Sequence, residues 1–182
     1  MQRTAQIVVG IGAAMMLVYF GYTRRAELNA KLWHLIHGHS VLFGGYQIPV
    51  PEDWTVTDQE ESDFTLAAAR TDGAVISVSE ARARLTAPRD VDFWVSVKHK
   101  LLSEQGLTEI VDHSVQYDGG TAACVAGSRH KPLTFRADSI VVDMDCVSTG
   151  PLNFIFLGRQ SELPDFDRIV SQIKLVASQT RN

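Results

Sequence analysis

The chain has 182 residues, of which 45% are hydrophobic and 21% charged, a composition typical of a globular protein. Residues 41–182 carry thirteen basic and twenty acidic side chains, a net charge of −7. Binding to nucleic acid needs a basic surface that neutralises phosphates, so we expect no nucleic-acid partner.

The N-terminal region contains a long uncharged stretch. Residues 4–23 lie between Arg3 and Arg24 and include no charged side chain. A helix of this length spans about 30 Å, the thickness of the hydrocarbon core of a bilayer. We therefore predict a transmembrane signal anchor in residues 1–25, with the lipid bilayer as a partner through residues 4–23.

Two other interpretations of this stretch stay open, a cleaved secretory signal and a buried helix of a soluble protein. No Ala-x-Ala cleavage pattern precedes Arg24 and Arg25, which favours a retained anchor. The basic residues after the stretch favour a cytoplasmic C-terminal domain, but long domains translocate largely regardless of charge. We therefore expect a single-pass membrane protein with an extracytoplasmic C-terminal domain, and the opposite orientation is the alternative. Gly10 and Ala14 form a small-xxx-small pair that could seat a second helix.

Residues 26–40 are predicted to form a juxtamembrane amphipathic helix. Its apolar residues follow the i, i+4, i+7, i+8 spacing of one helical face, and they are Leu28, Leu32, Leu35 and Ile36. Such a helix either continues the span or lies in the membrane interface.

Residues 41–182 form the predicted globular domain. Alternating apolar residues and turn signals predict strands near 41–43, 46–50, 64–68, 74–78, 111–117, 121–129, 140–147 and 152–158, with helices near 90–105 and after 164. We therefore predict an α+β fold. An N-terminal transmembrane helix is followed by an antiparallel sheet with two main helices packed on it.

Parts of this domain resemble the Mog1/PsbP-like domains. The features that carry the resemblance are the segment 45–54, which reads Gly-Tyr-Gln-Ile-Pro-Val-Pro-Glu-Asp-Trp, the helix with Phe93 and Trp94, and the closing helix with Phe166, Ile169 and Ile173. The resemblance covers residues 41–176. It implies a binding or assembly factor that acts on a larger complex, and it transfers no catalytic residues.

The two cysteines lie on the apolar faces of adjacent predicted strands. A hairpin that turns near Phe135 would place Cys124 almost opposite Cys146. The pair is therefore a disulfide candidate, and the alternative is two buried thiols.

Three histidines, His34, His37 and His39, lie within six residues and could bind zinc or copper. The alternative is that these amphipathic side chains lie on a helix at the level of the lipid headgroups and bind no metal. Asp143 and Asp145 could act as acid and base, but on a strand with one apolar face they are more simply its solvated side.

The sequence contains no catalytic motif that we can assign, and we expect no cofactor. It favours a membrane-anchored, non-catalytic binding or assembly domain that acts on a protein partner or a larger membrane complex. Two alternatives are an enzyme whose site is not visible in the sequence and a metal-responsive sensor that uses the histidine cluster.

Overall fold

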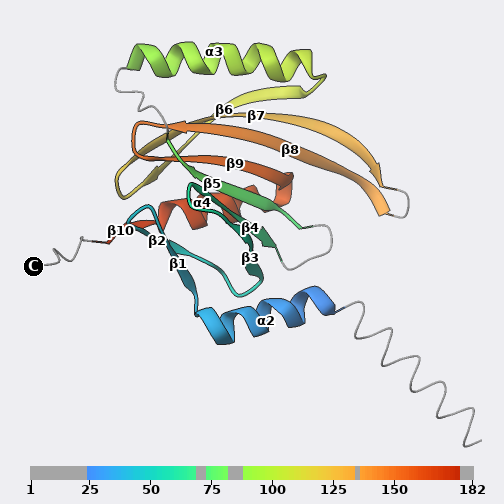
Figure 1. Cartoon of the computed structure of the whole chain (residues 1–182). Coiled ribbons are helices and arrows are strands. Elements are labelled where there is room, and N and C mark those ends of the chain that lie inside the picture. The colour runs from blue at the N-terminus through green and yellow to red at the C-terminus, as the bar shows by residue number, and fades with distance from the viewer. Residues whose placement is uncertain (1–23, 69–72, 82–87, 134–135, 177–182) are drawn as a thin grey trace, which may run out of the picture.

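The computed structural model describes residues 24–68, 73–81, 88–133 and 136–176, and Figure 1 shows the arrangement of their elements. In chain order the elements are α2 (Arg25–His37), β1 (Ser40–Phe43), β2 (Tyr46–Pro49), β3 (Trp54–Gln59), β4 (Asp63–Ala68), β5 (Val75–Glu80), α3 (Pro88–Glu104), β6 (Thr108–Tyr117), β7 (Gly120–Leu133), β8 (Arg136–Ser148), β9 (Leu152–Arg159), the 3-10 helix η1 (Gln160–Glu162), α4 (Leu163–Ser171) and β10 (Lys174–Leu175).

The strands form two antiparallel sheets rather than one. The larger sheet has seven strands in the order β3-β4-β5-β9-β8-β7-β6, and the smaller has three in the order β1-β2-β10. Apolar side chains alternate along the strands of the larger sheet, as Phe64 and Leu66 do on β4 and Phe154 and Phe156 do on β9. This alternation gives the larger sheet one face that is buried in the core.

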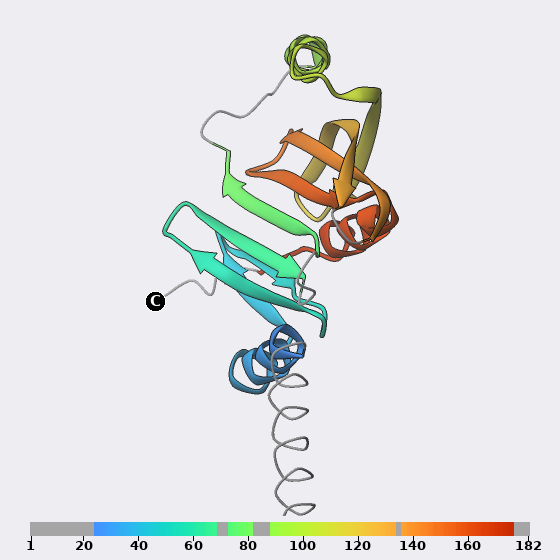
Figure 2. The same ribbon diagram turned by 90° about the vertical axis from the view of Figure 1, so that its right-hand side faces the viewer.

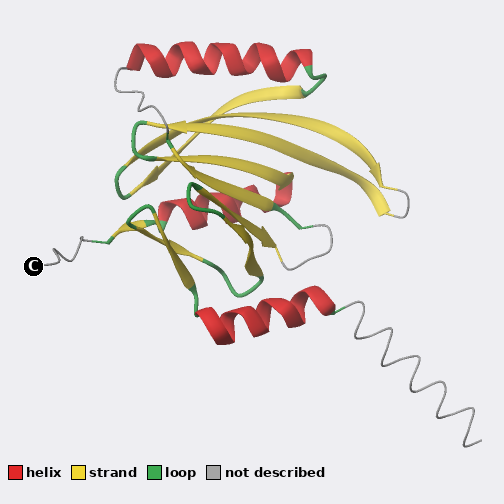
Figure 3. Cartoon of the chain, viewed as in Figure 1, coloured by secondary structure: helices red, strands yellow, loops and turns green. Residues whose placement is uncertain are grey.

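The core lies between that face, the small sheet and α4. Tyr46 and Ile48 of β2 belong to the same buried cluster as Phe166, Ile169 and Val170 of α4. Helix α4 begins with Pro164 in its first turn, a position that proline favours, and its apolar residues all fall on one face. The described chain is dominated by strands, as Figure 3 shows.

The β7–β8 hairpin confirms the register predicted from the sequence. Cys124 is directly opposite Cys146 in this hairpin. A disulfide joins the two sulfur atoms at 2.05 Å, with the two Cα atoms 3.9 Å apart. Both cysteines are buried in the main core, where the bridge joins the neighbouring strands β7 and β8.

Helix α3 packs on the opposite face of the larger sheet. Leu102 forms a small separate cluster with Leu107 and Val125, against which Trp94 is partly buried. Lys98 of α3 pairs with Asp145 of β8. Two views at right angles show α3 and α2 at opposite ends of the molecule (Figures 1 and 2).

The fold class predicted from the sequence is wrong in one part. The described residues do form an α+β fold, but none of their helices is long and apolar enough to cross a membrane. Helix α2, for example, has 13 residues, or about 20 Å at 1.5 Å per residue, and contains Arg25, Glu27 and Lys31. The residues predicted to span the membrane, 4–23, lie outside the described part of the chain, and so do Gly10 and Ala14.

Candidate binding surfaces

An open hollow of about 440 Å³ lies beside the small sheet. The residues that line it are His39, Ser40, Gln47, Pro49, Gln172 and Lys174. Gln47 Nε2 donates a hydrogen bond to Ser40 Oγ at 2.9 Å, so these two side chains partly satisfy each other. None of the described lining residues is an aspartate or a glutamate, so these residues supply no carboxylate for acid–base catalysis.

The three histidines predicted to bind a metal lie close together without forming a site for one ion. The rings of His34 and His39 stack with centroids 4.9 Å apart, whereas His37 stacks on Trp33 at 4.9 Å. Within the ranges that the structure describes, no three side chains of His, Cys, Asp or Glu gather as metal ligands. The reason is that both ring nitrogens of His34 already face backbone oxygens.

His34 connects α2 to the segment that leads into β3. Its Nδ1 lies 2.7 Å from the carbonyl oxygen of Gly38, and its Nε2 lies 2.8 Å from that of Pro51 and 2.9 Å from that of Trp54. A carbonyl oxygen only accepts hydrogen bonds, so the ring nitrogen that carries the proton is the donor, and which nitrogen this is depends on the tautomer of His34. The ring is partly buried, and its contacts fix which face of α2 is turned toward the domain.

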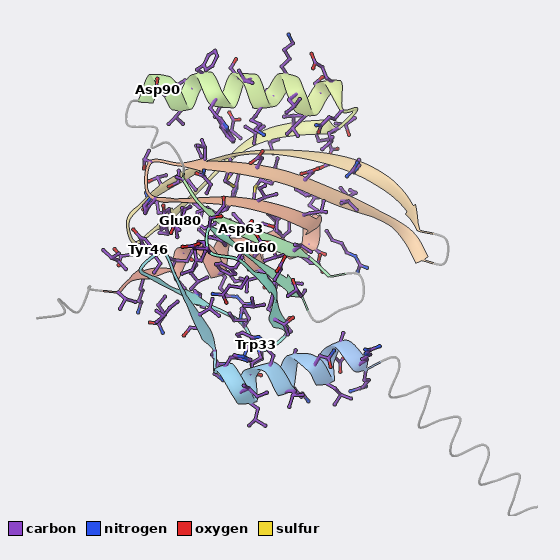
Figure 4. All side chains as sticks on the ribbon, viewed as in Figure 1. Trp33, Tyr46, Glu60, Asp63, Glu80 and Asp90 are labelled. Carbon is purple, nitrogen blue, oxygen red and sulfur yellow. A yellow bond between two sulfur atoms is a disulfide. The ribbon has the colours of Figure 1, made fainter. Side chains whose placement is uncertain are left out.

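The outer face of α2 is apolar. Leu28 and Leu32 are each 56% exposed, Leu35 is 82% exposed and Ile36 is 67% exposed. The inner face contains Ala30, which is 1% exposed, together with the partly buried Trp33 and His34. Trp33 extends from α2 toward the strands in Figure 4. The sequence correctly predicted a single apolar stripe, and the structure turns that stripe away from the protein.

The outer face of α3 exposes a second apolar stripe. Phe93 is 71% exposed, Val97 is 47% exposed and Leu101 is 40% exposed. Their i, i+4, i+8 spacing places the three side chains along one side of the helix. The sequence predicts one apolar face of this helix, made of Trp94, Val97, Leu101 and Leu102. In the structure Trp94 and Leu102 do pack toward the sheet, but Val97 and Leu101 are exposed.

Two histidine–aspartate pairs join elements that are far apart in the sequence. His113 Nε2 of β6 lies 2.6 Å from Asp167 Oδ1 of α4, and His99 Nε2 of α3 lies 2.6 Å from Asp112 Oδ1 of β6. Each pair links two elements that pack against each other, α4 with β6 and α3 with β6. No local motif marks these pairs, and the sequence analysis missed them.

The carboxylates of Asp143 and Asp145 are engaged in ion pairs on the face that α3 partly covers. Asp145 pairs with Lys98, and Asp143 Oδ2 lies 3.9 Å from Arg129 Nη2. Lys98 Nζ also lies 5.7 Å from the centre of the Trp94 ring. The two carboxylates have separate cationic partners, which favours a structural role over paired acid–base chemistry.

The chain matches no model of a known protein family, and no curated protein is significantly similar to it in sequence. The resemblance to Mog1/PsbP-like domains therefore stays a prediction from the sequence.

Proposed function

We propose that residues 41–182 are a non-catalytic binding domain that holds a protein partner or a subunit of a larger complex, with the outer face of α3 as its contact surface. The observation that carries this proposal is the exposed row of Phe93, Val97 and Leu101. Exposed apolar side chains that follow one helix face are characteristic of protein interaction sites.

The way α3 is attached supports this role. Among the described side chains of α3 none belongs to the main core, whereas Leu102 packs in the small cluster with Leu107 and Val125. The helix therefore adds little to the packing of the domain core. Its 17 residues hold an apolar face away from the sheet, where a partner can reach it.

Phe93 is the residue we assign as the anchor of the contact. Aromatic side chains dominate the binding energy of many protein interfaces, where polar residues surround them and exclude water. Lys100 and Glu104 lie on the exposed side of α3, with Lys100 Nζ 3.9 Å from Glu104 Oε1, and supply polar groups beside the apolar row.

The disulfide between Cys124 and Cys146 favours an oxidising compartment for this domain. Disulfides persist outside the cytoplasm and are rare inside it. We therefore propose a protein partner that is also extracytoplasmic. The membrane localisation predicted from residues 4–23 stays a prediction.

The proposal is tested by purifying the full-length chain from its native membranes after gentle solubilisation. We expect one partner to co-purify in a fixed stoichiometry and to be lost from the Phe93→Asp variant. Leu175→Asp is the matched control, because Leu175 on β10 is 54% exposed and lies outside α3. A partner retained equally by both variants would rule out α3 as the contact surface, and the absence of any stoichiometric partner would contradict the proposed function.

A further inference from the structure

We infer that α2 lies on an anionic lipid surface, with Leu28, Leu32, Leu35 and Ile36 inserted at the level of the headgroups. This goes beyond the proposed function, because it assigns a second surface and a different kind of partner. The surface lies at the opposite end of the molecule from α3 (Figures 1 and 2).

The orientation of α2 is the reverse of that of an ordinary surface helix. An amphipathic helix of a globular domain normally turns its large aliphatic residues toward the core. Helix α2 instead turns Ala30, Trp33 and His34 inward and exposes its four large aliphatic side chains. These four residues therefore contribute little to packing within the domain. An apolar environment outside the domain explains why such large aliphatic side chains are exposed.

This orientation is held by specific contacts. The two ring nitrogens of His34 face the carbonyl oxygens of Gly38, Pro51 and Trp54, and Trp33 packs against the main core. Rolling the helix to bury its leucines would break these hydrogen bonds. The leucine face is therefore fixed outward before any partner binds.

The charges around α2 favour lipid as the occupant. Residues 24–40 carry Arg24, Arg25 and Lys31 against the single acid Glu27, whereas residues 41–182 have a net charge of −7. Anionic lipid attracts the first segment and repels the second, which selects α2 as the side that faces the membrane. The uncharged residues 4–23 immediately precede α2 in the sequence, so the helix follows the most apolar part of the chain. The basic residues beside the exposed leucines are the charges that attract such a helix to anionic lipid.

The test measures the depth of α2 in a membrane. The full-length Leu35→Cys variant is labelled with a nitroxide and reconstituted into vesicles of phosphatidylcholine and phosphatidylglycerol. Both natural cysteines are held in the disulfide, so the label reports on position 35 alone. Collisions of the label with oxygen, which dissolves in lipid, are compared with collisions with a water-soluble nickel chelate. Phe93→Cys is the control, because Phe93 is exposed at the far end of the molecule.

We expect the ratio of oxygen to nickel collisions to be several-fold higher at position 35 than at position 93. We also expect it to fall when phosphatidylglycerol is omitted. Equal ratios at the two positions would overturn the inference. Shielding of position 35 from both reagents would also overturn it, because a protein or a second copy of the chain would then cover α2.

Discussion

The imidazole of His34 joins three parts of the chain. It connects the C-terminal end of α2 with the carbonyl groups of Pro51 and Trp54, which are 17 and 20 residues away. The sequence placed His34 in a candidate metal site because three histidines within six residues are a local pattern. The carbonyl groups that face its nitrogens belong to Gly38 at the end of α2 and to Pro51 and Trp54 after β2, and no local pattern marks them.

We expect His34→Ala to loosen α2. The substitution removes hydrogen bonds to partly buried carbonyl groups, a loss of about 1–3 kcal/mol. Amide hydrogen exchange should become faster in α2 and stay unchanged in α4. His37→Ala is the control, because His37 is exposed and its ring nitrogen contacts only a carbonyl of the same helix, that of Trp33. Equal effects of the two substitutions would contradict this role for His34.

Trp54 is one of the largest fully buried side chains of the described chain. It follows a Pro-Glu-Asp turn and is 1% exposed in the main core. Truncation of a buried tryptophan to alanine costs about 3–5 kcal/mol of stability. Trp54→Ala should therefore lower the urea midpoint far more than Lys100→Ala, whose side chain is 79% exposed. Similar midpoints for the two variants would show that the core does not depend on Trp54.

At the scale of elements, the hairpins could be predicted because their signals are local. The alternation of apolar residues on β4, β5, β7 and β8 identifies both the strands and the faces they bury. The orientation of the helices could not be read in this way. On α3, the stripe with Val97 and Leu101 is apolar enough to face a core. The ion pair between Lys98 and Asp145 instead favours the orientation in which the Lys98 side of the helix faces the sheet.

The division of the strands into two sheets could not be predicted from local sequence patterns either. Strand β10 has two residues and joins β2 from the far end of the sequence. The backbone N–H of Leu175 donates to Asp118 Oδ2 at 3.0 Å, which helps to hold this short strand in place. The sequence pattern predicts no strand at the position of β3, whose last three residues are exposed and give no sustained apolar alternation.

The disulfide should contribute measurably to stability. It closes a loop with a sequence separation of 22, and in the chain-entropy model such a loop stabilises the fold by about 3 kcal/mol. The double variant Cys124→Ala and Cys146→Ala should unfold at a lower urea concentration than the oxidised chain. The reduced wild-type chain should resemble the variant. Identical midpoints for oxidised and reduced wild-type chains would contradict the expected contribution.

At the scale of the whole molecule, the class of the domain could be predicted and the placement of its surfaces could not. Composition and periodicity indicate an acidic α+β domain. The positions of α2 and α3 at opposite ends depend on packing between distant elements (Figure 2). The same packing leaves an apolar stripe exposed on each of these two helices. For α3, the sequence alone suggests that the stripe would be buried.

We expect the fragment 24–182 to fold without the residues that precede it. The buried apolar residues of the described chain begin at Ala30, and the main core begins at Phe43. The near-ultraviolet circular dichroism of the fragment should match that of the full-length chain in detergent. A fragment that keeps its secondary structure but loses this signal would show that the core needs the N-terminal residues.

The proposed binding role is tested most directly by a photo-crosslinking amino acid placed at Phe93 in cells that produce the full-length chain. Position 93 is exposed on α3, and Leu175 provides a matched exposed position outside that helix. We predict one discrete covalent adduct with a protein partner from position 93 and none of that mass from position 175. The absence of an adduct at position 93, or the same set of adducts at both positions, would contradict the role of α3 as a partner-binding surface.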